Sequence, residues 1–353
     1  MITRAVWLDQ LRALAMCGIV LMHVLASSAV FHASWATTLF MLDSFTRIAI
    51  PLFWLISGWN SYCFPLPYRK RLSRIGWRLG WLVLASIVYN LFPWGVPKLA
   101  LPAHNTLWEM LSPWYYHLWF LHLWICFSLA QPLIGRVATR IGHVRLTALL
   151  LLWYGLCLYY LLANPKALME LMAHQFLGIN AHLWLVSLLY YMLGLALAAN
   201  PWRIYHKRQT DLAHHSIGIA LLCCVLGVYG LIAFFEYTTH PFFYWSEFTC
   251  VLYGLAAYLL LYRGYYYSLQ PTNPQRLDPL AIAIASASFT IYLWHPLLRD
   301  ILDHWMPYPI ETYGLTTALI IAVIYMAILL AGLVSLHRIL RIFYKKLSTL
   351  TLI

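Results

Sequence analysis

Charged residues are scarce in this chain, and acidic residues are the scarcest. Of the 353 residues only 10% are charged, with 11 Asp and Glu against 23 Lys and Arg. A soluble domain usually carries about 25% charged residues, so this chain has too few to form a water-exposed surface. Because 63% of the residues are hydrophobic, the composition excludes a soluble enzyme, an all-β secreted domain and a disordered regulator. It predicts an all-α, polytopic membrane protein.

The chain also lacks the cysteine patterns that bind metals or form disulfide frameworks. It has 7 cysteines, most of them inside apolar stretches, and no two of them form a C-x-x-C pair. No cluster of Cys and His has the spacing of zinc ligands. These absences predict no metal site and no disulfide framework. We also expect no tightly bound cofactor.

Long apolar stretches, in contrast, follow one another along the whole chain. A membrane-spanning helix needs about 20 mostly apolar residues. Ten segments approach or exceed that length: 8–29, 38–60, 75–91, 116–134, 146–163, 182–199, 217–235, 246–262, 281–302 and 315–336. No Ser/Gly-rich linker, low-complexity tract or internal repeat interrupts the series. The sequence therefore predicts about ten transmembrane helices in a single domain, 1–353.

The positive charges alternate along this series. Most Lys and Arg residues fall in the loops after even-numbered segments and near both termini, including Arg69, Lys70, Arg71, Arg74, Arg136, Arg140, Arg203, Lys207, Arg338 and Lys345. Cytoplasmic loops carry such an excess of cations, so both termini are predicted to be cytoplasmic. The net charge of +12 then reflects membrane topology and anionic lipids, and no nucleic-acid partner is expected.

Three ionisable residues share the first apolar segment, where charge is costly and often functional. Arg12 and His23 are eleven residues apart, so they lie on one helix face, separated by roughly 16 Å. His23 is either a packing residue or a group that carries protons as a general base. Asp9 is either a partner of Arg12 at i,i+3 spacing or a simple interfacial charge.

Arg47 lies near the middle of the second segment, deep in the expected bilayer. Asp43 is four residues earlier, at the spacing of an ion pair on one helix face. Pro51, four residues later, leaves the Arg47 carbonyl without its usual helical donor. Two interpretations stay open: a buried Asp43–Arg47 pair that locks the bundle, or a cation that stabilises an oxyanion or a carbonyl.

Further polar residues lie near the ends of other segments. His295 precedes Pro296 in the ninth segment, at nearly the depth of His23, and is either a packing or a functional residue. His117 and Trp119 lie in an aromatic-rich stretch that is typical of the membrane interface.

Arg71 and Arg74 are three residues apart in a cation-rich cytoplasmic loop, so they share a face where the third helix begins. The pair either binds a polyphosphate or serves topology and anionic lipids.

Five stretches, in this order along the chain, resemble motifs of the acyltransferase-3 family of integral membrane acyltransferases. They are Trp7-Leu8-Asp9-Gln10-Leu11-Arg12 with His23, the run from Arg47 to Gly58, Arg71-Leu72-Ser73-Arg74, Tyr116-His117-Leu118-Trp119-Phe120-Leu121 and Ile291-Tyr292-Leu293-Trp294-His295. Each motif is weak alone, but five in order are fairly specific. Residues 135–280 share only their hydrophobic character with the family.

The resemblance implies transfer of an acyl group, usually acetyl from acetyl-CoA, to a hydroxyl of an extracytoplasmic or lipid-linked glycan. It implies a bacterial inner-membrane enzyme whose partners are acyl-CoA, the glycan acceptor and membrane lipids. The residues expected to act are His23 as general base or transient acyl carrier, Arg47 as stabiliser of negative charge, His295 as an orienting residue, and Arg12, Arg71 and Arg74 as acyl-CoA-binding residues. Asp9, Asp43, His117, Trp119 and Ser57 are expected to support them.

Two other functional classes stay open at this point. A permease that exports a glycan precursor or a small molecule would use His23 and His295 as a proton relay. A structural subunit of a glycan assembly complex would leave Arg47 and His23 unexplained.

Overall fold

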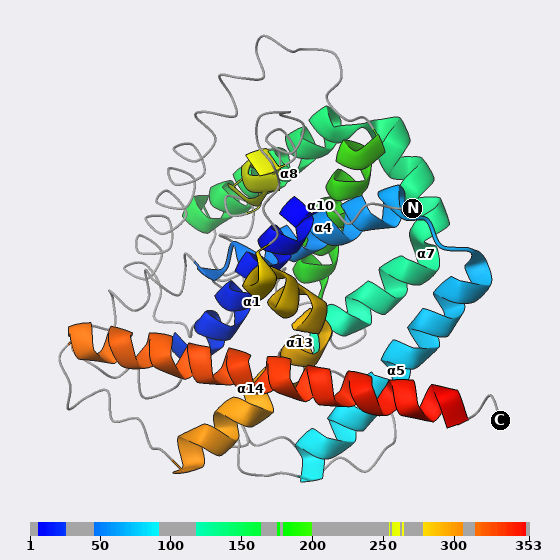
Figure 1. The fold of residues 1–353 in the computed structure, drawn as a ribbon. Coiled ribbons are helices and arrows are strands. Elements are labelled where there is room, and N and C mark those ends of the chain that lie inside the picture. Colours follow the sequence, from blue (N-terminus) through cyan, green and yellow to red (C-terminus); the bar gives the residue numbers. More distant parts are fainter. Residues whose placement is uncertain are drawn as a thin grey trace, which may run out of the picture. The chain divides into compact units, whose positions relative to one another are not determined.

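The computed structural model describes residues 6–25, 46–91, 118–163, 175–176, 179–199, 254, 256–261, 263–264, 278–305 and 315–350. Most of these residues are helical (Figure 1). The chain divides into two compact units. We call one the terminal unit, which combines Met1–Ala49, Trp94–Leu99 and Tyr267–Ile353. The other is the central unit, which combines Ile50–Pro93 and Ala100–Tyr266.

Three helices form the described part of the terminal unit: α1 (Val6–Leu25), α13 (Pro279–Trp305) and α14 (Leu315–Leu350). They pack pairwise against one another. Asp278 accepts hydrogen bonds from the backbone N–H groups of Leu280 (2.9 Å) and Ala281 (3.3 Å), so it caps α13. Thr290 on α13 and His337 on α14 join these two helices, with Oγ1 and Nδ1 3.0 Å apart.

The predicted second span, 38–60, is not one continuous helix. The backbone turns at Arg47 and Ile48, and α4 (Ala49–Cys63) begins directly afterwards. Pro51 has no N–H to donate to the Arg47 carbonyl, so the helical hydrogen bond between them cannot form. The break therefore occurs where the sequence leaves the Arg47 carbonyl without a helical donor.

The central unit contains α4 and four further helices: α5 (Tyr68–Leu91), α7 (Trp119–Ile141), α8 (His143–Ala163) and α10 (Ala181–Ala199). α7 packs against α5, α8 and α10, and α10 also packs against α8. Gly142 separates α7 from α8 at φ 79°, a conformation that favours glycine. A short antiparallel hairpin precedes α10, with β1 (Gln175–Phe176) pairing β2 (Ile179–Asn180). The prediction of helices alone did not include it.

A buried aromatic side chain, Trp54, organises the core between α4, α7 and α10. Trp54 is 0% exposed. Its ring centroid lies 4.2 Å from that of Phe120, 5.1 Å from that of Phe127 and 6.5 Å from that of Tyr191. Such tilted and edge-on ring pairs contribute free energy beyond the burial of their surface.

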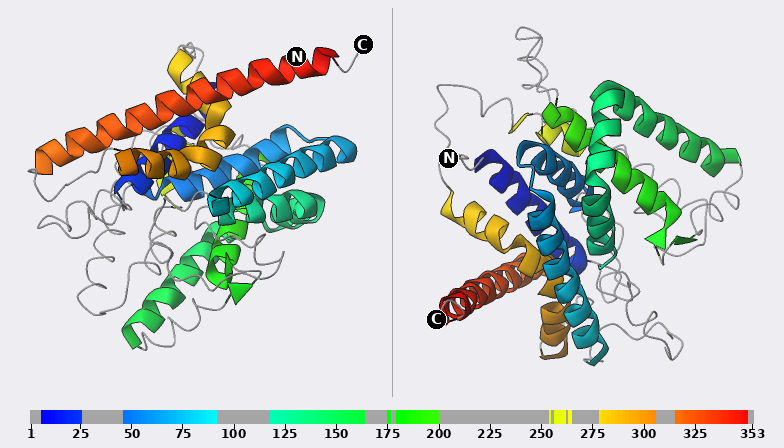
Figure 2. Two further views of the ribbon diagram at one scale, coloured as in Figure 1. Left: turned by 90° about the horizontal axis from the view of Figure 1, so that it is seen from below. Right: turned by 90° about the vertical axis from the view of Figure 1, so that its right-hand side faces the viewer.

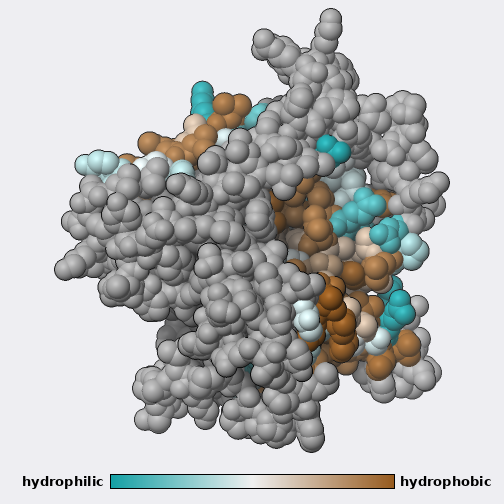
Figure 3. Space-filling view, turned by 90° about the vertical axis from the view of Figure 1, so that its left-hand side faces the viewer, coloured by the Kyte–Doolittle hydropathy of each residue, from teal (hydrophilic) through white to brown (hydrophobic). Residues whose placement is uncertain are grey.

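Five of the described helices are long and apolar enough to cross a membrane. They are or include Val6–Leu25, Trp119–Ile141, Ala181–Ala199, Pro279–Leu302 and Ile320–Ile342. α14 exposes apolar side chains at i, i+3, i+4 and i+8, namely Ile320, Val323, Ile324 and Ile328, a stripe suited to lipid. Apolar side chains also form much of the coloured surface in Figure 3. The chain is therefore a membrane protein.

The count of ten spans stays a prediction. The predicted spans 75–91 and 146–163 lie on α5 and α8, but neither helix meets the length and composition of a span over its described residues. The first turns of α5 are basic, which lowers its hydropathy. The span 217–235 and most of 246–262 lie outside the described residues. The cytoplasmic location of both termini likewise stays a prediction.

Candidate active site

Two predicted histidines from distant parts of the sequence lie face to face in the terminal unit. His23 is in the last turn of α1 and 8% exposed, and His295 is on α13 and 0% exposed. Their ring centroids are 4.9 Å apart, with 35° between the ring planes. The structure therefore brings together the two imidazoles that the sequence places at similar depth.

The contacts of His295 determine which of its ring nitrogens carries a hydrogen. Nδ1 lies 2.9 Å from the carbonyl oxygens of both Ile291 and Tyr292. Carbonyl oxygens only accept hydrogen bonds, so Nδ1 is the donor. In the neutral ring the lone pair is then on Nε2, which is the nitrogen able to accept a proton or a hydrogen bond.

Pro296 explains why the Tyr292 carbonyl can accept this bond. In an unbroken helix that carbonyl would accept from the N–H of residue 296, four positions later. Proline has no N–H, so the Tyr292 oxygen can accept from the neighbouring imidazole instead. The His295-Pro296 sequence thus sets both the orientation and the tautomer of the histidine.

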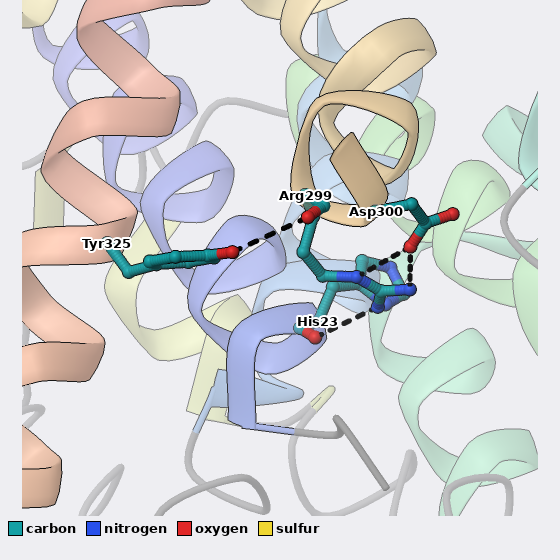
Figure 4. A network of polar contacts seen from close by, with 4 residues as sticks. All are labelled: His23, Arg299, Asp300 and Tyr325. Atoms are coloured by element: carbon teal, nitrogen blue, oxygen red, sulfur yellow. Dashed lines mark hydrogen bonds and ion pairs between the residues drawn. The ribbon is translucent and has the colours of Figure 1, made fainter. Parts of the chain in front are cut away.

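A buried charge pair, Arg299 and Asp300, lies one turn beyond His295 (Figure 4). Arg299 donates through Nε (3.1 Å) and Nη2 (2.5 Å) to Oδ1 of Asp300. Its Nη1 donates to the backbone carbonyl of His23, 3.1 Å away. The hydroxyl of Tyr325, on α14, donates to the Arg299 carbonyl at 3.5 Å. All three helices of the terminal unit therefore meet around His23.

Arg299 and Asp300 were missed as site residues. Arg299 lies near the end of the predicted segment 281–302, where a cation at a helix end needs no functional role. The structure instead continues α13 to Trp305 and buries both side chains, with residue exposures of 5% and 4%. The available signal was an adjacent Arg-Asp pair one helical turn after a candidate histidine in an apolar segment.

Arg12 and Asp9 form an ion pair near the beginning of α1. Nη1 of Arg12 donates to Oδ1 of Asp9 at 3.1 Å, and the side chains are 26% and 6% exposed, respectively. Arg12 points along the same face of α1 as His23 and is more open to its surroundings. This is the i,i+3 arrangement that the spacing favoured.

Arg47 lies in the turn before α4, beside α1. A Cβ atom built on Gly18 would be 3.1 Å from Cβ of Ala49 and 3.2 Å from the Thr46 carbonyl oxygen. This close approach holds the turn against α1 between Arg12 and His23. Asp43, its expected partner, lies outside the described residues.

Arg71 is partly buried in the central unit, at the beginning of α5. Its Nη2 donates to the Leu66 carbonyl at 3.3 Å, and its Nη1 is buried with no hydrogen-bond partner among the described residues. Arg74, three residues later, is exposed.

A chain of hydroxyl groups lies at the end of α4. Tyr191 donates to Oγ of Ser61 at 2.8 Å, and Ser61 donates to the carbonyl of Ser57 at 2.8 Å. The predicted Ser57 thus contributes its backbone oxygen. Trp119 begins α7, half-buried, with its ring 6.1 Å from that of Phe120. His117 lies outside the described residues.

The helices of the central unit have a one-sided charge. No Asp or Glu occurs in α4, α5, α7, α8 or α10. A single helix, α5, carries five cations: Arg69, Lys70, Arg71, Arg74 and Arg78. Arg78 places its guanidinium carbon 3.6 Å from the ring centroid of Trp124, a cation–π contact between α5 and α7. Over the residues that the structure describes, no three His, Cys, Asp or Glu side chains gather as a metal site would require.

Comparison with known proteins assigns a family to this arrangement. The model of the acyltransferase-3 family, described as an acyltransferase domain, matches residues 5–338. No curated protein matches the chain. The family match covers nearly the whole chain, including both histidines, the Arg299–Asp300 pair and Arg71. The chain therefore belongs to the acyltransferase-3 family and is a membrane acyltransferase.

Proposed function

We propose that this protein transfers an acyl group, in the first place acetyl, from cytoplasmic acyl-CoA to a hydroxyl of an extracytoplasmic or lipid-linked glycan. The observation that carries the proposal is the buried pair of His23 and His295 in a member of an acyltransferase family. A hydroxyl is a poor nucleophile until a base removes its proton, and imidazole is the side chain best suited to that task near neutral pH.

The proposed reaction needs one base and one thioester. A ring nitrogen of His23 takes the proton of the acceptor hydroxyl. At the same time the hydroxyl oxygen attacks the carbonyl carbon of the thioester. The carbon–sulfur bond then breaks, and the CoA thiolate takes the proton from the His23 imidazolium as it leaves. His23 is the more exposed of the two histidines, so it is the one that meets the acceptor, and His295 orients it.

Arg47 is proposed to stabilise the negative charge that develops on the thioester oxygen. Its position supports this role, because Arg47 is half-buried in the turn that packs against α1 directly before α4. Gly18 keeps this turn close to α1, the helix that carries His23.

The donor is proposed to bind through its phosphate groups to Arg71 and Arg74, and Arg12 is proposed as a further acyl-CoA-binding residue. Two observations support an anionic ligand at Arg71: its Nη1 is buried without a hydrogen-bond partner in the described part of the chain, and the helices around it contain no carboxylate. A phosphate oxygen would satisfy both the hydrogen bond and the charge.

The proposal extends to the chemical class of the acceptor and to the membrane in which the protein lies. The ten predicted helices and the stretch Tyr116-His117-Leu118-Trp119 resemble the enterobacterial common antigen O-acetyltransferase, so we propose a glycan acceptor and the bacterial inner membrane. Mass spectrometry of surface glycans from wild-type and deletion cells tests this, because the deletion should remove the mass of one acetyl group per modified sugar.

The central experiment uses purified protein in detergent with radiolabelled acetyl-CoA and extracted glycan. We expect His23→Ala to lower acyl transfer by about 100-fold or more, as for loss of a general base. His122→Ala is the matched control and should retain activity, since the Nδ1 of His122 lies 3.0 Å from the backbone carbonyl of Leu118, the N-cap of the same helix.

Two outcomes would redirect the proposal. Label that stays covalently on wild-type protein, but not on His23→Ala, would make His23 an acyl carrier rather than a base. A wild-type protein that releases no CoA in detergent, yet moves glycan across vesicle membranes, would be a permease and would contradict the proposal.

A further inference from the structure

Helix α13 contacts His23 at two separate points. The ring of His295 faces the imidazole of His23, and the guanidinium of Arg299, four residues later, donates to the backbone carbonyl of His23. Residues four apart lie on one face of a helix. One face of α13 therefore holds both the side chain and the main chain of the same histidine.

The carbonyl of His23 is a suitable anchor because of its place in α1. Carbonyl groups in the last turn of a helix have no intrahelical donor, and His23 lies in the last turn of α1. A charged donor makes a stronger hydrogen bond to such a carbonyl than a neutral one. Arg299 supplies that donor from α13.

Asp300 sets the direction of the guanidinium. It accepts from Nε and Nη2 of Arg299 through a single oxygen, Oδ1, which leaves Nη1 directed at the His23 carbonyl (Figure 4). From the other side, Tyr325 of α14 donates to the Arg299 carbonyl. The guanidinium is therefore oriented by Asp300, a residue outside α1.

Stability alone is a weak explanation for this buried pair. Its side chains are only 7% and 4% exposed, and removing two charges from water costs about as much as their attraction returns. Replacing such a pair with apolar residues is often neutral for stability. What apolar residues cannot replace is the directed hydrogen bond to the His23 carbonyl.

We propose that Arg299 is a positioning residue for His23: with its partner Asp300, it fixes the last turn of α1 so that the imidazole keeps its place against His295. Arg299 itself does not touch the substrate. The inference rests on the proposed function, in which His23 acts on the acceptor hydroxyl. It gives the Arg-Asp pair a role separate from donor binding.

The test compares Arg299→Met/Asp300→Leu, which removes both charges together, with Arg299→Lys, which keeps a cation beside Asp300. The control is Arg338→Met, which removes an exposed arginine from α14 of the same unit. Each purified protein is assayed for kcat and for KM of acetyl-CoA. The rate at which diethyl pyrocarbonate modifies His23 is followed by peptide mass spectrometry, and does not depend on activity.

We expect the double variant to keep its thermal melting temperature and its KM, and to lose on the order of 10- to 100-fold in kcat, as for a small misplacement of a reacting group. Arg299→Lys should recover part of kcat, and His23 should be modified faster in the double variant. A double variant with wild-type kcat and a wild-type modification rate would overturn the inference. If the double variant does not insert into membranes, a wild-type kcat in Arg299→Lys would overturn the inference.

The proposed function fails in a different way. If wild-type protein shows no acyl transfer, the function is wrong, while the modification rate of His23 still reports whether Arg299 holds it.

Discussion

Within α13, Pro296 controls how the imidazole of His295 is held. The missing N–H of the proline makes the Tyr292 carbonyl available to Nδ1 of His295. A proline inside a helix is also expensive, at about 3 kcal/mol. The residue therefore combines a cost in stability with a defined tautomer.

The variant Pro296→Ala separates these two effects. Alanine restores an N–H that donates to the Tyr292 carbonyl and so competes with His295. We expect the free energy of unfolding to rise by up to about 3 kcal/mol, while kcat falls several-fold because the ring of His295 is less tightly oriented. Thermal melting and steady-state kinetics on the same preparation measure both.

Pro132→Ala is the matched control, because Pro132 lies inside α7. It should gain stability in the same way without loss of kcat. Equal kinetics for both variants would show that Pro296 has no role in orienting His295.

At the scale of residues, local spacing predicted which side chains pair, but the position of Arg299 near a helix end did not indicate that it is buried. The i,i+3 spacing favoured the Asp9–Arg12 pair, which the structure forms at 3.1 Å. Equal depth suggested His23 and His295, whose rings meet. Arg299 was missed because hydropathy near a helix end does not distinguish a solvated cation from one buried against another helix.

Two helices of the central unit approach unusually closely. A Cβ on Gly58 of α4 would overlap the carbonyl oxygen of Tyr191 of α10, and a Cβ on Gly194 of α10 would overlap the carbonyl oxygen of Leu55 of α4. Both obstacles are backbone atoms, which cannot move aside as a side chain can. The glycines thus permit the contact that brings Tyr191 to Ser61.

Gly58→Ala and Gly194→Ala should each destabilise the protein by about 1–3 kcal/mol through overpacking. They should also raise KM for acetyl-CoA, because Arg71 lies near this contact and interacts electrostatically with Tyr191. Thermal melting and the kinetics of acyl transfer provide the measurement.

Gly80→Ala on α5 is the control, since a Cβ there would meet nothing within 4 Å. Alanine is the better helix former, so this variant should gain about 0.5–1 kcal/mol. If all three variants gain stability, the close packing of α4 and α10 is not required.

At the scale of elements, apolar length located several helices well but did not reveal where a helix breaks. Pro51 was recognised as a weak point, yet the segment 38–60 still read as one helix because its hydropathy is continuous. The break at Arg47 and Ile48 results from a missing hydrogen bond. The β1–β2 hairpin has too few residues for any periodicity to predict.

Considered as a whole, the molecule distributes its charges unequally. Carboxylates pair with arginines in the terminal unit, at Asp9 and Asp300, whereas the five named helices of the central unit have none. The resulting excess of positive charge in the helices of the central unit attracts an anionic ligand over a distance that depends on the salt concentration.

We therefore expect KM for acetyl-CoA to rise several-fold between roughly 0.05 and 0.5 M salt, with little change in kcat. Arg71→Ala/Arg74→Ala should have a higher KM at low salt and a flatter salt dependence. Arg338→Ala/Arg341→Ala, which removes two exposed cations of α14, should behave as wild type. An unchanged salt dependence in the first variant would argue against donor binding at Arg71 and Arg74.

The alternation of charges along the sequence predicted the orientation of the whole chain but not its division into two units. Each unit joins segments that are far apart in sequence, as α1 and α13 are (Figure 2). Hydropathy describes how each helix meets the membrane. It contains no information on which helices pair, since that depends on side-chain shape and on single buried contacts such as Arg299 with His23.

The length of α14 offers a way to watch the proposed site from a distance. The helix is continuous over 36 residues, and Ile342, exposed on its surface, lies roughly 26 Å along the axis from Tyr325 at 1.5 Å per residue. A spin label or fluorophore at position 342 would thus lie far from the proposed active site, on the same continuous helix as Tyr325, which contacts Arg299. A change in the label's signal during turnover would report movement of α14 relative to the residues around His23.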